Sequence, residues 1–372
     1  MKEGWEYRQF ESCLVKVPKQ VQVKSKDYKK EGKFPIVSQE AELISGYWDD
    51  ENIVYKPQEP VVIFGDHTKN IKYVDFDFVV GADGTHILRT KNDIYSKFFY
   101  YVLKSIKLRQ LGYARHYKLL KEKFIPVPPL SEQQSIVDYL DSAFAKIDAM
   151  KANAEKALNE AKALFQSSLK EMLEPKEGWE EKALKDFATD MYRGSGVKRD
   201  QVTEDGISCV RYGEIYTKYN YHFNECDSHT LEEYVNSPKY FEYGDILFAI
   251  TGESVEDIGK SIAYTGKEKC IAGGDMVVMK HNYEPRYISY ALSTPSAIKQ
   301  KGRGKTKLKV VHTNIPSLKE IIIPIAPINE QTIIADTLDS LKSKVDKLQE
   351  NYDKISQECD ALKQAILRQV FE

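Results

Sequence analysis

One pentapeptide occurs twice, as Lys2-Glu3-Gly4-Trp5-Glu6 and as Lys176-Glu177-Gly178-Trp179-Glu180. A second signature follows each copy, as Pro129-Leu130-Ser131-Glu132-Gln133 and as Pro327-Ile328-Asn329-Glu330-Gln331. Each second signature opens a long stretch without glycine or proline, at 131–174 and 329–372. An internal repeat of this kind indicates one structural plan used twice. The sequence therefore predicts four parts, in the order globule, long helix, globule, long helix.

The repeat also closes on itself. The first long stretch runs through Pro175 into the second pentapeptide, and by analogy the second stretch, which ends at Glu372, leads back to the first pentapeptide. A ring of this kind predicts antiparallel helices related by a pseudo-twofold axis, with the chain ends close together. The tryptophans Trp5 and Trp179 are 174 residues apart, whereas Gln133 and Gln331 are 198 apart. We therefore expect a symmetric arrangement that carries two globules of different length and sequence.

Heptad spacing of apolar residues predicts a coiled coil in both long stretches. The expected seam residues are Leu140, Phe144, Ile147, Leu158 and Phe165 in the first stretch and Leu338, Leu341, Val345, Leu348 and Leu362 in the second. Ser131 with Gln134 fits a capping box, and Asn329 is the matching N-cap. Helices of this length span roughly 65 Å and would act as semi-rigid spacers. A dimerisation coil or an ordinary two-helix hairpin is the alternative, but a hairpin needs helices that are adjacent in sequence.

Both globules are expected to be mixed α+β domains with short strands. Buried strands are predicted at 60–64 and 245–250, each followed by a polar turn, and helices at 95–106 and 286–293. The predicted domain organisation is a first globule at 1–128, a first helix at 129–175, a second globule at 176–326 and a second helix at 327–372.

Composition limits the class of protein. No stretch reaches the roughly 18 apolar residues that a membrane span needs, and the N-terminus lacks a secretory signal. The 5 cysteines are scattered without a Cys-x-x-Cys pair, which favours a reducing cytoplasm and argues against disulfides and structural zinc. The formal net charge of −2 does not indicate a nucleic-acid-binding protein by itself. Any such function must depend on local charge.

Local positive charge does occur, at the same place in both halves, shortly before the second signature. The two basic clusters contain Lys104, Lys107, Arg109, Arg115 and Lys118 in the first half and Lys299, Lys301, Arg303, Lys305, Lys307 and Lys309 in the second. Gly302 and Gly304 interrupt the second cluster, where cations fall on every second residue. A flexible loop of this kind suits a phosphate backbone. A solvated charged face is the alternative, and the recurrence in both halves weighs against it.

The sequence contains no recognisable active site. It has no Gly-x-Gly-x-x-Gly loop, and both Gly304-Lys305-Thr306 and Gly259-Lys260-Ser261 lack the first glycine of a P-loop. The 7 histidines are scattered without metal-ligand spacing, and Asp66-His67 is interpreted as a turn rather than an acid–base pair. We expect no catalytic residue and no metal in this chain.

Taken together, the two variable globules, the two long helices, the paired Gly-Trp and the paired Glu-Gln helix starts resemble the DNA-specificity subunit (S subunit, HsdS) of Type I restriction–modification systems. The resemblance covers essentially the whole chain. The segments 63–68 with 79–84, and 211–215 with 244–247, also look like parts of target-recognition domains in this family. The second signature departs slightly, since Ala326-Pro327-Ile328-Asn329 replaces the Pro-Pro-Leu-Ser of the first.

The resemblance implies a non-catalytic, sequence-specific DNA-binding subunit. Each globule would be a target-recognition domain that binds one half of a bipartite, asymmetric site in double-stranded DNA. The helices would set the spacing and dock two methyltransferase (M) subunits, and restriction (R) subunits would join through them. S-adenosylmethionine, ATP and magnesium are expected in those partner subunits and no cofactor in this chain.

Phosphate contacts are then assigned to the two basic clusters, and base contacts to polar loops that follow the core strands. The candidate base-reading residues are Thr68, Lys69, Asn70, Tyr113, Arg211, Tyr212, Thr251, Glu253 and Ser254. Two other functions stay open: a coiled-coil scaffold whose globules bind proteins, and a specificity subunit of a methylation or phage-defence system that does not cut DNA.

Overall fold

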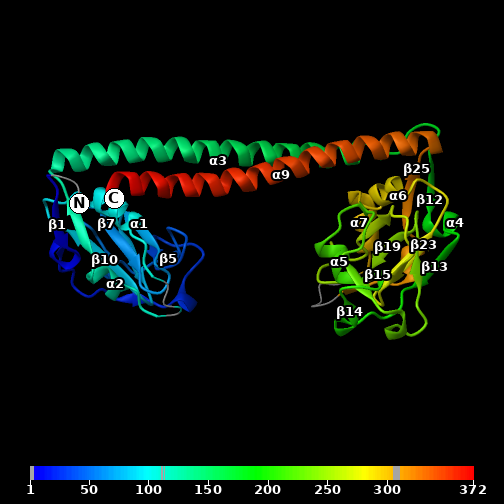
Figure 1. Cartoon of the computed structure of the whole chain (residues 1–372), viewed down its shortest axis with the longest axis horizontal. Helices are drawn as coiled ribbons and strands as arrows, with labels where there is room; N and C mark the ends of the chain where they lie inside the picture. Colours follow the sequence, from blue (N-terminus) through cyan, green and yellow to red (C-terminus); the bar gives the residue numbers. More distant parts are fainter. Residues whose placement is uncertain (1–3, 110–111, 113, 305–310) are drawn as a thin grey trace. The chain divides into compact units, whose positions relative to one another are not determined.

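The computed structural model describes residues 4–109, 112, 114–304 and 311–372. The chain forms two compact units. The first unit consists of residues 1–155 and 351–372, and the second consists of residues 156–350. Two long helices, α3 (Leu130–Met172) and α9 (Ile328–Phe371), each contribute to both units (Figure 1). The predicted order of globule, helix, globule and helix is confirmed.

The first unit contains a small antiparallel sheet, a small mixed sheet and a two-stranded ribbon. One sheet has the order β2 (Leu14–Val15), β10 (Thr85–Thr90), β7 (Val61–Gly65) and β8 (Ile71–Val74). The other has the order β3 (Gln22–Val23), β9 (Phe78–Gly81), β4 (Phe34–Val37) and β5 (Gly46–Trp48), and β6 (Val54–Tyr55) also pairs with β9. The ribbon joins β1 (Glu6–Gln9) to β11 (Phe124–Val127). The predicted strand at 60–64 is β7, whose five residues are all buried.

Helix α1 (Ser96–Ser105) connects the sheet that contains β7 to the long helices, and α2 (Tyr117–Lys121) follows later in the sequence. Apolar residues of α1 at i, i+1, i+4 and i+5 form a buried stripe, which is typical of a helix packed on a sheet. Phe98 and Val102 lie in one core with Phe64 of β7, Leu140 of α3 and Phe371 of α9. Trp5 packs against the same core, so the two ends of the chain lie close together, as the circular repeat predicts.

The second unit repeats this plan with larger sheets. Its ribbon joins β12 (Glu180–Ala183) to β25 (Ile322–Ile325). One five-stranded sheet has the order β13 (Asp190–Arg193), β23 (Met276–Lys280), β19 (Ile246–Ala249), β21 (Ser261–Tyr264) and β16 (His222–Phe223). The other has the order β14 (Val202–Thr203), β17 (Ser228–Thr230), β15 (Ile207–Val210), β22 (Cys270–Ala272) and β18 (Tyr240–Phe241).

A short pair, β20 (Thr251–Gly252) with β24 (Val311–His312), completes the strands of the second unit. Its shorter helices are α4 (Leu184–Phe187), α5 (Tyr212–Thr217), α6 (Pro285–Ala291), α7 (Pro295–Lys301) and α8 (Ile315–Lys319). The core places Tyr287 and Tyr290 of α6 with Phe248 of β19, Phe165 of α3 and Leu338 of α9. The strand and helix predicted at 245–250 and 286–293 are therefore β19 and α6.

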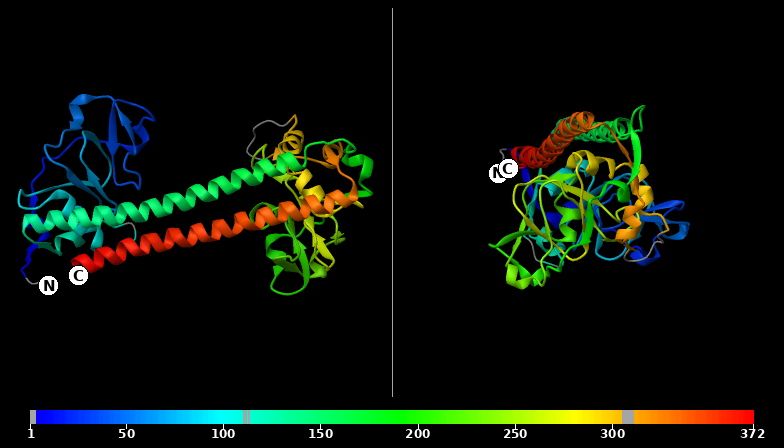
Figure 2. Two further views of the ribbon diagram at one scale, coloured as in Figure 1. Left: turned by 90° about the horizontal axis from the view of Figure 1, so that it is seen from above. Right: turned by 90° about the vertical axis from the view of Figure 1, so that its right-hand side faces the viewer.

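The two long helices run antiparallel within each unit (Figure 1 and Figure 2). In the first unit, Lys363 of α9 forms an ion pair with Asp148 of α3 at 2.5 Å. In the second unit, Nζ of Lys162 of α3 donates to Oε1 of Gln349 of α9 at 2.7 Å. The start of one helix therefore lies beside the end of the other, as the closed repeat requires.

Most of the residues predicted for the seam are buried or partly buried. The seam residues that the structure buries are Leu140, Ile147, Leu158, Phe165, Leu338 and Val345, and those that it partly buries are Phe144, Leu341 and Leu348. Leu362 was wrongly placed in the seam, because it is exposed while Cys359 and Leu367 are buried. An α-helix has 3.6 residues per turn, so a strict heptad drifts around the helix. The seam therefore steps from Cys359 past Leu362 to Leu367.

The predicted helix caps are also wrong. Helix α3 begins one residue before Ser131, and the carbonyl of Pro129 accepts hydrogen bonds from the N–H groups of Glu132 and Gln133. Ser131 therefore lies inside the first turn, and Gln134 bonds to Asp138 instead of closing a capping box. Helix α9 begins in the same way, with the carbonyl of Pro327 accepting from Glu330 and Gln331.

The repeated signatures form the same hydrogen-bonded frame in both units. Nε1 of Trp5 donates to Glu132 at 2.9 Å, and Nε1 of Trp179 donates to Glu330 at 3.1 Å. The buried amide of Gln133 accepts from the N–H of Tyr95 at 2.8 Å and donates to the carbonyl of Pro128 at 2.8 Å.

Gln331 is equally buried and repeats these contacts. It accepts from the N–H of Glu284 at 3.0 Å and donates to the carbonyl of Ala326 at 2.8 Å. We call the residues Trp5, Glu132, Gln133, Trp179, Glu330 and Gln331 the shared frame. Because every buried polar group needs a partner, this frame fixes where each helix starts against its sheet.

A pair of tyrosine–carboxylate contacts continues the correspondence about two helical turns further along. The hydroxyl of Tyr101 donates to Asp141 at 2.5 Å, and that of Tyr290 donates to Asp339 at 2.6 Å. Burial raises the pKa of Asp339, but hydrogen bonds from His222, Tyr290 and Arg286 outweigh it and lower the pKa to about 2. Within the second unit, an ionised carboxylate of α9 therefore binds side chains of β16 and α6.

Candidate nucleic-acid interface

In the first unit, the loop that follows β7 lies against the last part of the basic cluster, between Arg115 and Lys118. The carbonyl of Asp66 accepts the N–H of His116 at 2.8 Å, and Oδ1 of Asp66 accepts the N–H of Tyr117 at 2.7 Å. Arg115 precedes His116 and is exposed. The structure therefore brings together two groups of residues that are about 50 positions apart in the sequence. From the sequence, one group was expected to contact bases and the other to contact phosphates.

The second unit makes the same connection. The carbonyl of Ile250 accepts the N–H of Thr313 at 2.9 Å. Thr251 pairs with His312 between β20 and β24, and its hydroxyl lies 3.1 Å from Nδ1 of His312. In both units, the loop after the central strand is therefore hydrogen-bonded to the end of the basic cluster or to the segment just after it.

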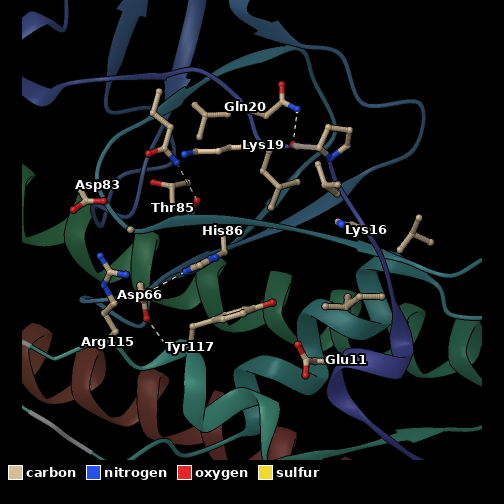
Figure 3. A pocket seen from close by; sticks show the side chains of 18 residues that line it. Glu11, Lys16, Lys19, Gln20, Asp66, Asp83, Thr85, His86, Arg115 and Tyr117 are labelled. Carbon is tan, nitrogen blue, oxygen red and sulfur yellow. Dashed lines mark hydrogen bonds and ion pairs between the residues drawn. The ribbon is translucent and has the colours of Figure 1, made fainter.

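A pocket of about 550 Å³ opens on this surface in the first unit (Figure 3). Cations line it at Lys16, Lys19 and Arg115, and carboxylates at Glu11, Asp66 and Asp83. Gln20, Gln22, Thr85 and His86 add neutral hydrogen-bonding groups. A pocket that combines cations with donors and acceptors can hold both a phosphate and the edge of a base.

A fixed polar cluster lies in this pocket. Nε2 of His86 is 3.3 Å from Oδ2 of Asp66, and the imidazole stacks on the ring of Tyr117 with centroids 4.1 Å apart and planes at 9°. Burial by itself raises the pKa of Asp66, but the bonds from the Tyr117 N–H and from His86 outweigh it, so the pKa lies below its usual value. Asp66 is therefore ionised near neutral pH and orients the imidazole.

The basic clusters are only partly as expected. The cluster residues that the structure exposes are Lys104, Lys107, Arg109, Arg115, Lys118, Lys299 and Arg303. Lys305, Lys307, Lys309 and the candidate Tyr113 lie outside the described residues. Lys301 contradicts the expectation, because it is buried and its Nζ donates to the hydroxyl of Ser261 at 3.0 Å. Burial lowers the pKa of Lys301 to about 7.

The physical reason is local secondary structure. Period-two spacing presents cations on one side only in an extended chain. The structure instead places residues 295–301 in helix α7, which Thr294 caps by accepting the N–H of Ala297. Two positions along a helix turn the side chain by about 200°. Lys299 therefore faces solvent while Lys301 faces the core.

The expected base-reading loops are held by their own contacts. The hydroxyl of Thr68 and the amide of Asn70 both donate to the carbonyl of Gln39, at 2.6 and 2.9 Å. Lys69 between them has a left-handed backbone, with φ of 62°. Such contacts set the shape of the loop, so Thr68 and Asn70 are first of all positioning residues.

In the second unit, Ser254 donates to Asp257 at 2.6 Å, whereas Glu253 is exposed. Tyr212 is exposed at the start of α5. The neighbouring Arg211 has a buried Nε for which the described residues offer no hydrogen-bond partner. An unpaired buried donor beside an exposed tyrosine is a better candidate for a ligand contact than the tied loop residues.

Sequence reasoning did not identify His86, Lys16, Lys19 or Gln20. The signal for His86 was a polar residue in a strand that follows the Asp83-Gly84 turn and pairs with β7. This signal for a binding residue was weak, because polar and apolar residues alternate along many strands and a single polar residue fits that pattern equally well. Lys16 and Lys19 lie in a segment whose sequence predicted no role.

Across the described ranges, no group of three or more His, Cys, Asp or Glu residues could hold a metal ion. None of the helices in those ranges is long and apolar enough to cross a membrane.

Comparisons with known proteins agree with this arrangement. The sequence matches the family described as Type I restriction modification DNA specificity domain over residues 2–160 and 176–357. It is 24% identical over 355 residues to the Escherichia coli Type I restriction enzyme EcoR124I/EcoR124II specificity subunit, covering 89% of this chain and 85% of that protein.

Two solved structures share the fold over 100% of this chain. One is a chain from a type I R-M system studied for complex assembly and conformational transition, with a TM-score of 0.69, 17% identity and 98% of that chain covered. The other is the HsdS subunit from Thermoanaerobacter tengcongensis, with a TM-score of 0.53, 18% identity and 97% of that chain covered. The match to both halves of the repeat shows that this chain belongs to the Type I restriction–modification DNA specificity subunits.

Proposed function

We propose that the two units recognise two different halves of one bipartite DNA site. The observation that carries this proposal is the shared frame, which is the same in both units although the sheets that it supports differ in strand number and sequence. A symmetric frame with two different binding surfaces suits an asymmetric target. Half-sites would then be separated by a fixed spacing, as in dimeric DNA-binding proteins.

We also propose that each unit docks one methyltransferase subunit. Three pairs of exposed apolar residues lie at equivalent positions, 198 residues apart. The pairs are Phe124 and Ile322, Leu130 and Ile328, and Leu164 and Leu362. Their exposed fractions lie between 47% and 66%. Each unit therefore exposes one member of every pair, since Leu362 belongs to the first unit and Leu164 to the second.

Exposed large apolar residues that recur in this way favour one partner bound twice, because a protein surface that only faces water has no need to repeat them. The relative from Escherichia coli is a subunit of a restriction enzyme, and the first structural match comes from an assembled system. These names support methyltransferase and restriction subunits as the partners. S-adenosylmethionine, ATP and magnesium would be bound by those partners, and this chain would supply specificity without catalysis in the cytoplasm.

The experiment is to express the chain with its methyltransferase partners and to sequence methylated adenines in genomic DNA. A single bipartite motif with a constant gap and unequal halves is expected. Methylation without such a motif would contradict the proposal, and so would a motif with identical halves. Addition of the restriction subunit would then distinguish a system that cleaves from one that only methylates.

A further inference from the structure

The two units offer an internal comparison at the pocket of Figure 3. Asp66 and Ile250 occupy equivalent positions: the N–H of Asp66 donates to Gly84 at 2.8 Å and that of Ile250 to Asp275 at 3.0 Å. Their carbonyls accept from His116 and Thr313, at 2.8 and 2.9 Å. The backbone is therefore hydrogen-bonded in the same way at both places.

The side chains at these places differ in kind. His86 pairs with Phe64 across β10 and β7, and Val277 pairs with Phe248 across β23 and β19. Phe64 and Phe248 each precede the equivalent positions 66 and 250 by two residues, so His86 corresponds to Val277. In the second unit both Ile250 and Val277 are buried in the apolar core.

The fold is therefore built without a histidine at this strand position. Valine occupies the equivalent position in the second unit, so the strand itself does not require an imidazole there. Asp66 does have a structural role, because it caps α2 by accepting the N–H of Tyr117. In the second unit, Asn314 performs that role for α8 by accepting the N–H of Ser317. His86 contacts Asp66 and Tyr117, but its own position needs no imidazole in the other unit.

Its hydrogen bonding is also incomplete. Ionised Asp66 can only accept, so Nε2 of His86 carries the hydrogen in the contact at 3.3 Å. In the neutral imidazole Nδ1 is then an acceptor, and the described part of the chain provides no partner for it. The side chain is 35% exposed. Stacking on Tyr117 holds the ring in one orientation.

Three cations, Lys16, Lys19 and Arg115, line the pocket that contains this acceptor. Figure 3 shows Arg115 on the side of the pocket where Asp66 lies. Cations that bind phosphates fix the register of a duplex, whereas a rigid acceptor can distinguish base pairs. In the major groove, the groups that donate to an acceptor are the exocyclic amines of adenine and cytosine.

We propose that His86 is a base-reading residue of the first unit, whose Nδ1 accepts a hydrogen bond from the exocyclic amine of an adenine or a cytosine. The proposal rests on the function proposed above. Asp66 and Tyr117 are positioning residues for His86. The second unit, with Val277 at the equivalent position, reads its half-site with other residues.

The test uses the complex of this chain with its methyltransferase partners and a library of duplexes with both half-sites randomised. The variant His86→Val introduces the residue that the second unit carries at this position. Loss of preference at one base position in one half-site is expected, with discrimination there falling roughly 5- to 100-fold. The other half-site and the spacing should not change.

A second variant guards against misfolding. His86→Gln keeps an acceptor and is expected to retain a preference at that same position, or to shift it toward adenine, which glutamine contacts through two hydrogen bonds. Lys19→Met is the control for a non-specific contact and should lower binding to all sequences alike. Thermal unfolding of each variant confirms that the unit is folded.

Unchanged base preference at every position in both His86 variants would overturn the proposal, even if overall affinity fell. A wild-type complex that selects no bipartite motif would instead contradict the function proposed for the whole chain. The two failures are therefore distinguishable in one experiment.

Discussion

Trp5 and Glu132, which are 127 residues apart, are joined by a hydrogen bond of 2.9 Å from the indole Nε1 to the carboxylate. This contact ties the ribbon at the start of the chain to the first turn of α3, and the bond from Trp179 to Glu330 repeats it in the second unit. The two sequence signatures that define the repeat are thus partners in space. In each unit, the first signature therefore contacts the second.

The first prediction concerns the amide at the centre of the shared frame. Replacing Gln133 by leucine would leave the N–H of Tyr95 and the carbonyls of Asp93 and Pro128 without their partner. An unsatisfied buried polar group costs about 1–3 kcal/mol, so the first unit should lose about 2–4 kcal/mol of stability. Urea unfolding followed by tryptophan fluorescence measures this loss. Gln134→Leu, at an exposed neighbour, should change stability by less than about 0.5 kcal/mol.

The second prediction concerns the recurring apolar residues. Leu362→Glu in the first unit or Leu164→Glu in the second should each remove one methyltransferase subunit from the complex, because a charge on a docking surface must be desolvated. The double variant should bind none. Native mass spectrometry of the purified complex counts the subunits. Tyr139→Glu is the matched control, since the equivalent residue is Thr337 and no apolar pair exists there. Loss of both subunits on a single substitution would contradict independent docking.

The third prediction follows from the buried amine of Lys301. Because burial lowers its pKa to about 7, the folded state releases a proton that the unfolded state, with an ordinary lysine pKa, still binds. Stability from this residue therefore rises with pH above about 7, by at most about 1.4 kcal/mol per pH unit. Lys301→Met lacks this dependence, so the stability of the wild type relative to this variant should increase between pH 7 and 9.

The control for that experiment lies on the same helix. Lys299 is exposed on α7, and Lys299→Met should differ from the wild type by the same small amount at every pH. Parallel pH profiles for the wild type and Lys301→Met would show that folding does not lower the pKa of this amine.

The fourth prediction separates phosphate contacts from structural lysines. Replacing Lys104 and Lys107 by alanine should weaken binding of the complex to all duplexes and reduce the salt dependence of log K by roughly one for each lost contact. Lys301→Met should leave that slope unchanged, because its amine is bonded to Ser261 inside the unit. Fluorescence anisotropy at several salt concentrations gives the slopes. Identical slopes for the wild type and the double alanine variant would remove the first basic cluster from the interface.

Some features of this chain follow from the sequence alone. The doubled signatures predict the four-part order, and the run of valine, isoleucine and phenylalanine at 61–64 predicts the buried strand β7. Periodicity also predicts the long helices and most of their seam. These features depend on local propensity and on repetition, both of which can be read along the chain.

Other features were decided by tertiary structure. A heptad pattern places Leu362 in the seam, but the actual twist of α9 brings Leu367 there instead. Spacing of two residues suggests that Lys299 and Lys301 act together, but a capped helix turns one of them into the core. In both cases the orientation of a side chain depends on helical turns whose phase is fixed by packing.

The candidate site shows the same division most clearly. Repetition and difference along the sequence are enough to predict one frame used twice and two globules that differ in length and sequence. They do not predict that Asp66, His86 and Tyr117 meet in one pocket, or that Ile250 and Val277 take the places of the first two in the other unit. The physical reason is that strand pairing brings together residues that are far apart in the sequence, and which strands pair depends on the whole sheet rather than on the pattern within any one segment.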